Sequence, residues 1–395
     1  MGDLFTNPTD KEIFYIEKKY FKIINETKKL SPIQKFQVLG LYHRVNILFM
    51  IMNAGSGHIG TSFSIIDFLI MFHKYHKTDD YLFSSKGHDS PAFYSIGIVK
   101  NNLSFSKIFE FRKLNGLPGH PDRSIKIFKF NTGSLGMGVS KSKGYLSLKK
   151  NKNIFVILGD GELQEGQIWE SINTKIPKGL KIIIDRNQLQ SDYFTKSTSD
   201  IGNIKRKFEA FNLKVKVIDG HNFEKIKNAL KNLDEYDCLI LNTIKGKGVS
   251  FMQGNKNIYR KVNYPYHSGA PNYEIYKKAL GEVSLKINNY IQDKVSFKFK
   301  SFIPKDIKKD NIFKYSLISI YEDFLLNKFK TNKKLFCLDA DLLIDHGLLK
   351  IKKRYSNRFI ECGIAEMDMV SQASGIAENG GIPICHSFSC FMSFR

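Results

Sequence analysis

Short apolar runs constrain the fold of this chain more than any other feature of its sequence. They occupy residues 153–158, 181–184, 214–218 and 238–241, with stretches of helical pattern between them. A short apolar run that ends at glycine or polar residues is typical of a strand buried on both faces of a sheet. Because strands and helices alternate, we expect an α/β fold in which helices sandwich a parallel sheet.

Helical patterns precede the first of these runs. Apolar residues recur at helical spacing over residues 34–52, and the glycine-rich segment 55–60 ends this pattern. A second helical pattern covers residues 64–74, and a third starts near Ser90. The amino-terminal part of the first domain is therefore expected to be helical.

The chain of 395 residues is long enough for two or three domains. We interpret residues 1–34 as a charged amino-terminal extension and 35–285 as the first domain. Residues 286–312 are rich in lysine without regular periodicity, so we expect a linker there. A second α/β domain begins near residue 313, but only about 80 residues remain, which is short of a usual domain. We expect this second domain, residues 313–395, to be incomplete.

Charge and cysteine content narrow the class of protein. The formal net charge of +23 comes from lysines spread along the whole chain, without a zinc-finger or RNA-binding signature. The longest apolar runs, such as residues 68–72, are too short to span a bilayer. The five cysteines include no Cys-x-x-Cys pair. We expect a cytoplasmic protein with neither a nucleic-acid nor a membrane partner, whose basic surface helps to steer phosphorylated substrates.

The strongest motif follows the run at 153–158. Gly159 and Gly161 flank Asp160, so that the backbone can turn tightly and approach a diphosphate. The run at 181–184 leads in the same way to Asn187 and Leu189. The Asp160 carboxylate, the Asn187 amide oxygen and a carbonyl near Leu189 form an oxygen set that suits Mg²⁺ or Ca²⁺. An ordinary turn with a capping aspartate is the alternative, which the paired asparagine disfavours.

Several glycine-bordered segments, taken together with this motif, resemble the transketolase family of thiamine diphosphate enzymes. They occur in the order that the family has, at residues 55–58, 85–88, 117–122, 132–138, 158–166, 245–251, 267–272, 339–342 and 361–366. The resemblance covers roughly residues 35–395. It implies thiamine diphosphate bound through a divalent metal, and transfer of a two-carbon ketol unit from a ketose phosphate to an aldose phosphate.

The resemblance also implies roles for individual residues. His58, His120 and His267 correspond to histidines that contact sugar hydroxyls and assist proton transfer. Each could instead cap a turn, as a histidine beside glycine often does. Cofactor contacts are implied for His88, Gly133, Leu135, Gly159, Asp160, Gly161, Glu162, Asn187, Asp341, Phe388 and Phe391. Leu135 and the two phenylalanines would otherwise be interpreted as core residues.

Glu366 is the principal catalytic candidate. A glutamate at the start of a helix is usually a cap or a surface charge. By resemblance, its carboxyl hydrogen-bonds the pyrimidine ring of thiamine and promotes loss of the thiazolium proton. An apolar pocket, to which Phe388 and Phe391 would contribute, would help this carboxyl to hold a proton.

The chain also departs from the family pattern. Lys314 stands where the family has a phosphate-binding arginine, Asp345 where it has a small polar residue, and Ile59 where proline is usual. The sequence ends at Arg395, inside the expected pyrimidine-binding domain, so we expect a fragment, a truncated product or a subunit. The resemblance implies a homodimer that shares each active site between subunits, or a complementing carboxy-terminal subunit. Another thiamine diphosphate enzyme and a non-catalytic cofactor-binding chain are the remaining hypotheses.

Overall fold

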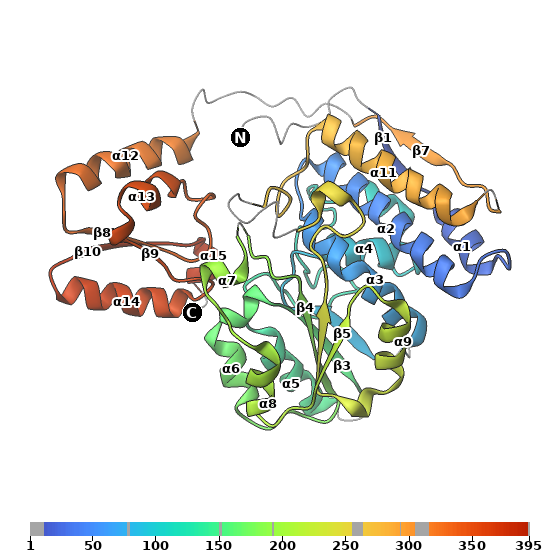
Figure 1. Cartoon of the computed structure of the whole chain (residues 1–395), viewed down its shortest axis with the longest axis horizontal. Helices are drawn as coiled ribbons and strands as arrows, with labels where there is room; N and C mark the ends of the chain where they lie inside the picture. Colours follow the sequence, from blue (N-terminus) through green and yellow to red (C-terminus); the bar gives the residue numbers. More distant parts are fainter. Residues whose placement is uncertain are drawn as a thin grey trace.

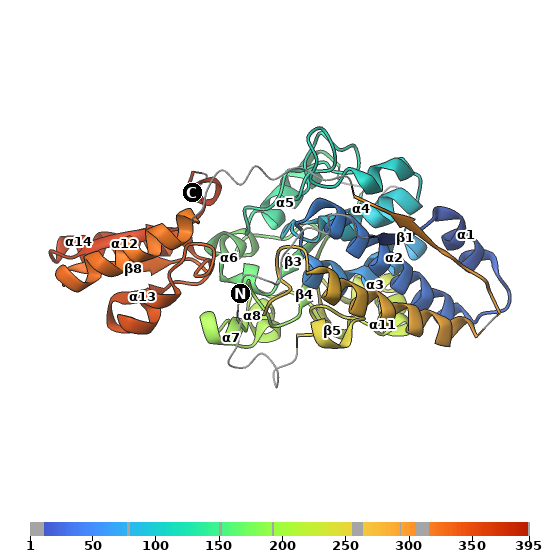
Figure 2. The same ribbon diagram turned by 90° about the horizontal axis from the view of Figure 1, so that it is seen from above.

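The computed structural model describes residues 12–76, 80–149, 152–191, 193–254, 264–292, 294–304 and 316–393. The chain forms a first unit, which comprises the described residues up to 304, and a second unit, residues 316–393. Figures 1 and 2 both place the second unit at one end of the first.

A five-stranded parallel sheet forms the centre of the first unit, with the strand order β2-β3-β4-β6-β5. Its strands are β2 (Tyr81–Ser84), β3 (Ile154–Gly159), β4 (Leu180–Arg186), β5 (Val215–Asp219) and β6 (Cys238–Asn242). The four apolar runs of the sequence correspond to β3, β4, β5 and β6. β2 was not anticipated, because it is only four residues long and two of those four are tyrosine and serine.

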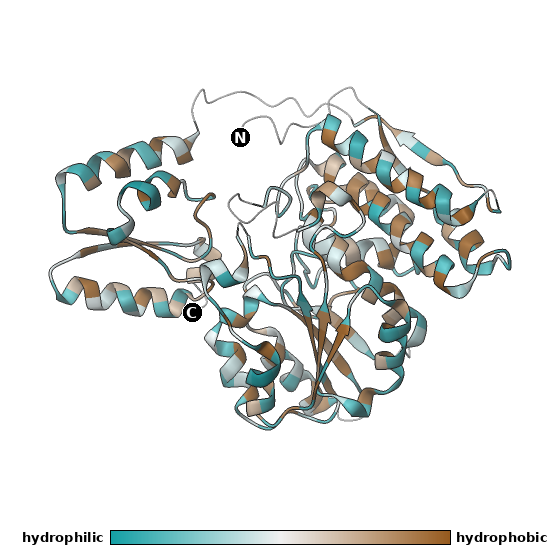
Figure 3. Cartoon of the chain, in the orientation of Figure 1, coloured by the Kyte–Doolittle hydropathy of each residue, from teal (hydrophilic) through white to brown (hydrophobic). Residues whose placement is uncertain are grey.

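Alternate residues of the central strands face opposite helical layers. Phe155 and Ile157 of β3 belong to a core that also includes α2 (Pro32–Ala54), α3 (Ile59–Tyr75), α4 (Ser90–Val99), α9 (Phe223–Lys231) and α11 (Tyr273–Ile291). Val156 and Leu158 face a second core with α5 (Gly138–Leu148), α6 (Gly166–Ile172) and α8 (Ile204–Ala210). Figure 3 shows the apolar strands enclosed by helices with mixed surfaces. Burial of both sheet faces explains the apolar runs that form β3, β4 and β6, whereas the edge strand β5 is only partly buried.

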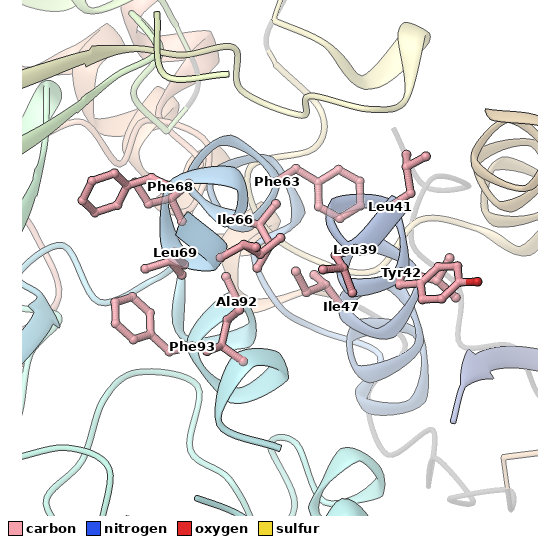
Figure 4. Close-up of a cluster of buried hydrophobic side chains, with 14 of the residues drawn as sticks. Leu39, Leu41, Tyr42, Ile47, Phe63, Ile66, Phe68, Leu69, Ala92 and Phe93 are labelled. Carbon is pink, nitrogen blue, oxygen red and sulfur yellow. The ribbon is translucent and has the colours of Figure 1, made fainter. Parts of the chain in front are cut away.

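Helix α2 lies at the centre of the larger core. Its amino terminus is a capping box, in which Ser31 and Gln34 exchange side-chain to backbone hydrogen bonds, and Pro32 occupies the first turn. Leu39 and Ile47 of α2, Phe63 and Ile66 of α3 and Phe93 of α4 lie in one buried cluster (Figure 4).

The ends of the first unit differ from the expected extension and linker. Strand β1 (Ile13–Ile16) pairs in antiparallel register with β7 (Phe299–Phe302), and α1 (Lys18–Glu26) packs on the main core. Helix α11 continues to Ile291, beyond the expected start of the linker at residue 286. The described residues of the amino-terminal segment, 12–34, and the first part of the linker therefore belong to the first unit. Periodicity could not reveal this, because β1 and β7 pair across most of the chain.

The second unit is a small three-layer structure. Its parallel sheet has the order β10-β8-β9, formed by Ile382–His386, Leu335–Asp339 and Phe359–Glu361. Helices α12 (Leu317–Thr331) and α13 (Leu349–Arg354) cover one face, and α14 (Glu366–Glu378) covers the other (Figure 1). The short helix α15 (Ser389–Met392) follows β10.

Among the described residues, none of the helices combines the length and the apolar character that a membrane crossing requires.

Candidate active site

A cavity of about 350 Å³ opens at the carboxyl ends of the parallel strands, where the two units meet. The residues expected at the site line it without exception: His58, His88, His120, Gly133, Leu135, Gly159, Asp160, Gly161, Glu162, Asn187, Leu189, His267, Asp341, Glu366, Phe388 and Phe391. Loops that are distant in the sequence converge here because parallel strands deliver their carboxyl ends to one edge of a sheet.

The oxygen ligand set forms where β3 and β4 end. These strands are neighbours, with Gly159 paired to Asp185, so Asp160 and Asn187 emerge side by side. Asp160 accepts hydrogen bonds from the backbone N–H groups of Gly161 and Gln188, and Asn187 Oδ1 accepts one from Leu189 N at 3.0 Å. Burial raises the pKa of the Asp160 carboxyl to about 6. A desolvated carboxyl of this kind favours a bound cation.

The donor chemistry fits a hard divalent cation. The described residues contain no group of three histidine, cysteine, aspartate or glutamate side chains placed to share a metal. A metal at this site would therefore rest on one carboxylate, one amide oxygen and a carbonyl, and would leave positions for diphosphate oxygens, as Mg²⁺ sites do. The carbonyl of Leu189 lies 3.4 Å from Lys245 Nζ, so it faces this end of the cavity.

Glu162 connects three of the loops around the cavity, near the expected diphosphate position. Its carboxylate accepts hydrogen bonds from Ser85 Oγ at 2.5 Å, Gly136 N at 2.9 Å and Gly159 N at 3.0 Å. These donors come from the ends of β2 and β3 and from the loop before α5. Besides its expected contact with the cofactor, Glu162 therefore holds these three loops together, a role that only the tertiary structure reveals.

Four imidazoles lie close together in the cavity. The ring centroid of His58 lies 5.3 Å from His267, 5.4 Å from His88 and 5.7 Å from His120. Burial lowers the pKa of each ring, to about 4 for His120 and well below the ordinary value for the other three. All four rings are therefore uncharged at neutral pH.

Hydrogen bonds assign opposite tautomers to two of these rings. His88 Nδ1 lies 3.0 Å from the Lys86 carbonyl, which can only accept, so His88 donates through Nδ1 and offers Nε2 as an acceptor. Lys245 Nζ donates to His267 Nδ1 at 2.9 Å, so His267 carries its proton on Nε2. The cavity thus presents both a donor and an acceptor at neutral pH.

The second unit supplies the remaining wall. Glu366 lies at the first turn of α14 and is 2% exposed, and Ser387 Oγ donates to its carboxylate at 3.4 Å. Phe388 and Phe391 lie beside it, with ring centroids 5.6 Å apart. Several contacts join the units. Ile364 N donates to Gln164 Oε1 at 2.8 Å, Ser191 N donates to Asp341 Oδ2 at 3.3 Å, and Lys352 Nζ lies 5.5 Å from the centre of the Tyr193 ring. One chain therefore provides both walls, whereas the resemblance implies walls from two subunits.

Two buried lysines were missed by sequence reasoning. Lys86 Nζ donates to Asp185 at 2.6 Å and to Thr61 Oγ1 at 2.7 Å, and Lys245 Nζ donates to the Gln190 carbonyl at 2.6 Å. Both lysines stand next to glycine in the segments 85–88 and 245–251. The sequence did contain a signal for them: each is a lysine in a glycine-bordered loop at the end of a strand, from which its long side chain can reach into the site.

Comparisons with known proteins agree with this geometry. The family profile for the thiamine diphosphate-binding domain of transketolase matches residues 41–262. The chain belongs to the transketolase family. The profile spans the central sheet and the loops that follow β3 and β4, so the first unit contains a thiamine diphosphate-binding domain of the transketolase type.

Individual relatives of the transketolase family are moderately similar. Human transketolase is 26% identical over 362 residues, which are 86% of this chain and 58% of the human protein. The 6-deoxy-6-sulfo-D-fructose transketolase subunit SqwG of Clostridium sp. (strain MSTE9) is 33% identical over 247 residues, which are 55% of this chain and 90% of that subunit. The chain thus spans about three fifths of human transketolase and aligns with nearly all of a shorter subunit.

Solved transketolase structures share the fold. Transketolase from Campylobacter jejuni has a TM-score of 0.52 and 22% identity, and the match covers 92% of this chain and 66% of that chain. Transketolase from Leishmania mexicana has a TM-score of 0.53 and 18% identity. Helices around a parallel sheet, followed by a smaller α/β unit, are the shared architecture.

Proposed function

We propose that this chain binds thiamine diphosphate through Mg²⁺ and transfers a two-carbon ketol unit from a ketose phosphate to an aldose phosphate. One observation carries the proposal: a single cavity combines an oxygen ligand set, four uncharged imidazoles and the buried carboxyl group of Glu366. A transketolase needs these three functions, because the metal holds the diphosphate, hydroxyl protons must move, and the cofactor must be activated.

In this proposal each part of the cavity has a separate task. Asp160, Asn187 and the Leu189 carbonyl hold Mg²⁺, and Ca²⁺ suits the same donors. The cofactor is enclosed by His88, Gly133, Leu135, Gly159, Gly161, Glu162, Asp341, Phe388 and Phe391. Bound there, thiamine diphosphate would supply the electron sink that the two-carbon fragment requires.

The histidines and Glu366 act on protons. His267 donates through Nε2, so it can polarise a carbonyl or hold a hydroxyl oxygen, whereas the free acceptor on His88 can receive a hydrogen bond. His58 Nδ1 is buried and has no hydrogen-bond partner among the described residues, so it is open to a hydroxyl of the sugar. We assign His58, His120, His267 and Glu366 to the catalytic group.

The assembly and location are also proposals. Some relatives are themselves named as subunits, among them SqwG and an apulose-4-phosphate transketolase subunit of Phocaeicola vulgatus. These relatives support complementation by a second polypeptide, which is the alternative to a homodimer. The described cysteines are all unbridged, which supports a reducing compartment such as the cytoplasm.

The direct test is an assay of the chain with Mg²⁺, thiamine diphosphate, a ketose phosphate and an aldose phosphate, with products measured by mass spectrometry. We expect two-carbon transfer to increase strongly when the carboxy-terminal part of a related transketolase is added, since the chain covers only part of such enzymes. Release of CO₂ from a 2-oxo acid such as pyruvate, supplied in a parallel reaction, with no two-carbon transfer between the sugars would identify another thiamine enzyme. Cofactor binding without any transfer in either mixture would support a non-catalytic chain.

Asp345 is expected to disfavour phosphorylated substrates. It lines the cavity from the second unit, and none of the described residues of that unit adds a lysine or arginine to the lining. Lys314 lies outside the described residues. Replacing Asp345 with asparagine should tighten binding of a pentose 5-phosphate about tenfold, because like charges about 10 Å apart repel by about 1 to 2 kcal/mol at an effective dielectric constant of about 20.

Calorimetry on the cofactor-saturated chain tests this expectation. The unphosphorylated pentose should bind equally to the parent and to Asp345→Asn. Asp323→Asn is the matched control, because Asp323 is an exposed residue of α12 that does not line the cavity. An equal gain for the phosphorylated and unphosphorylated sugars would contradict a charge effect.

A further inference from the structure

A buried ionic cluster lies behind the cavity wall, between α2 and α3. Arg44 of α2 donates two parallel hydrogen bonds to Asp67 of α3, from Nη1 to Oδ1 at 2.9 Å and from Nη2 to Oδ2 at 3.0 Å. Both side chains are almost fully buried. Burial raises the pKa of Asp67, but Arg44 and His221 outweigh this effect and hold that pKa below its usual range. The helices that carry the pair are locked together by the apolar packing shown in Figure 4.

The cluster is attached to one functional loop by two further hydrogen bonds. Arg44 Nε donates to the Lys247 carbonyl at 2.7 Å. His221 bridges to the other end of this loop: its Nδ1 lies 2.9 Å from Asp67 Oδ2, and its Nε2 accepts from Ile244 N at 2.9 Å. Because a backbone amide can only donate, His221 must carry its proton on Nδ1 and donate it to Asp67. The loop 244–247 is therefore held on both sides of Lys245.

Two close approaches show that the loop is held tightly. A Cβ atom on Gly248 would lie 2.7 Å from Arg44 Cδ, and Gly248 has a φ of +106°. A Cβ atom on Gly60 would lie 2.8 Å from Lys245 Cγ, and Gly246 N donates to the Gly60 carbonyl at 2.9 Å. Side chains at these glycines would displace Arg44 or Lys245, so the lysine has little freedom to move.

Lys245 is the point at which this cluster meets the active site. Its ammonium group contacts the carbonyls of Leu189 and Gln190 and the Nδ1 atom of His267. A shift of the Lys245 side chain would therefore move both a candidate metal-binding carbonyl, that of Leu189, and a candidate catalytic imidazole, that of His267.

We propose that Arg44, Asp67 and His221 form a clamp that positions Lys245, and through it the Leu189 carbonyl and His267, for cofactor binding. These three are positioning residues, because none of them lines the cavity. The effect of the clamp on cofactor affinity rests on the proposed function, whereas its effect on the mobility of the loop 244–247 depends on the fold alone.

His221→Asn separates positioning from stability. The shorter amide can still donate to Asp67 but cannot reach Ile244 N, whereas His221→Gln can present both a donor and an acceptor. We expect His221→Asn to weaken thiamine diphosphate binding at saturating Mg²⁺ about tenfold, the lower end of outer-shell effects. His221→Gln should recover most of that loss. His76→Ala is the control, because the side chain of His76 is also buried and its hydrogen bond goes to Asp80, which is outside the clamp and the loop. It should lower the Tm without changing the Kd.

A double-mutant cycle with Lys245→Met tests whether the clamp acts through the lysine. His221→Asn should cause no further loss of affinity in the Lys245→Met background. Equal losses in both backgrounds would overturn the proposal. Amide hydrogen exchange gives a readout that needs no cofactor: residues 244–248 should exchange faster in His221→Asn and not in His76→Ala. Unchanged exchange at this loop would overturn the clamp, whereas failure of the parent to bind thiamine diphosphate would count only against the proposed function.

Discussion

Replacing Asp160 with alanine is expected to weaken Mg²⁺-dependent binding of thiamine diphosphate by more than about a hundredfold, the upper end of what loss of an outer-shell partner costs a metal site. Asp160 is the one carboxylate in the proposed ligand set, and it lies 3% exposed at the end of β3. Without it, the proposed site loses its one anionic protein ligand, and only neutral protein oxygens remain to hold the cation together with the diphosphate.

Calorimetric titration with the cofactor, at fixed Mg²⁺ and again with a chelator, measures this effect. Asp160→Asn should show nearly the same loss, since it keeps the size of the side chain and removes the charge. Asp234→Ala is a suitable control, because Asp234 is exposed and does not line the cavity. Full retention of Mg²⁺-dependent affinity in both Asp160 variants would show that the cofactor is bound elsewhere or without the metal.

Exchanging Glu366 for glutamine is expected to slow deuterium exchange at C2 of the bound thiazolium by about a hundredfold or more, the usual contribution of a positioned acid or base. The amide retains the shape of the side chain but cannot give or take the proton that activates the cofactor. Affinity for Mg²⁺ and thiamine diphosphate should change little, because Glu366 belongs to the second unit and is not one of the proposed metal ligands.

Quenched exchange followed by proton NMR gives the rate without any sugar substrate, so the experiment isolates cofactor activation from transfer. Glu378→Gln, at the exposed end of the same helix, is the matched control. If the thiazolium C2 exchanges at the parent rate in both Glu366→Gln and Glu378→Gln, the group that activates the cofactor must be another residue of the cavity.

The two experiments probe different walls of the cavity and therefore different steps. A chain that binds the cofactor through Asp160 but shows no acceleration by Glu366 would have a functional first unit and an inactive second wall. The reverse result, activation without metal-dependent affinity, is not compatible with the proposed site. Their combination decides whether the second unit of this chain completes an active site.

Local patterns in the sequence were sufficient to predict most strands of the central sheet and the turn that follows β3. The apolar runs predicted β3, β4 and β6, because strands buried on both faces must be apolar along their length. The run at 214–218 predicted β5, which is an edge strand and only partly buried. Gly159, Asp160 and Gly161 predicted the turn after β3, and strand parallelism predicted that Asn187 would meet Asp160. These inferences depend only on neighbours in the sequence and on the rule that parallel strands end at one edge.

The identity of the partners of each side chain was decided by the tertiary structure. Pairing of β1 with β7, the brace formed by Glu162 and the clamp of Arg44, Asp67 and His221 all join segments far apart in the chain, and no periodicity records such meetings. The charge state of the histidines was also decided by the tertiary structure. Their pKa values are lowered by burial among loops that converge only when the sheet has formed. The sequence by itself determined which residue types stand at the strand ends, whereas the folded chain determined which donors, acceptors and charges face one another, because desolvation and hydrogen bonding depend on distances that exist only after distant segments pack.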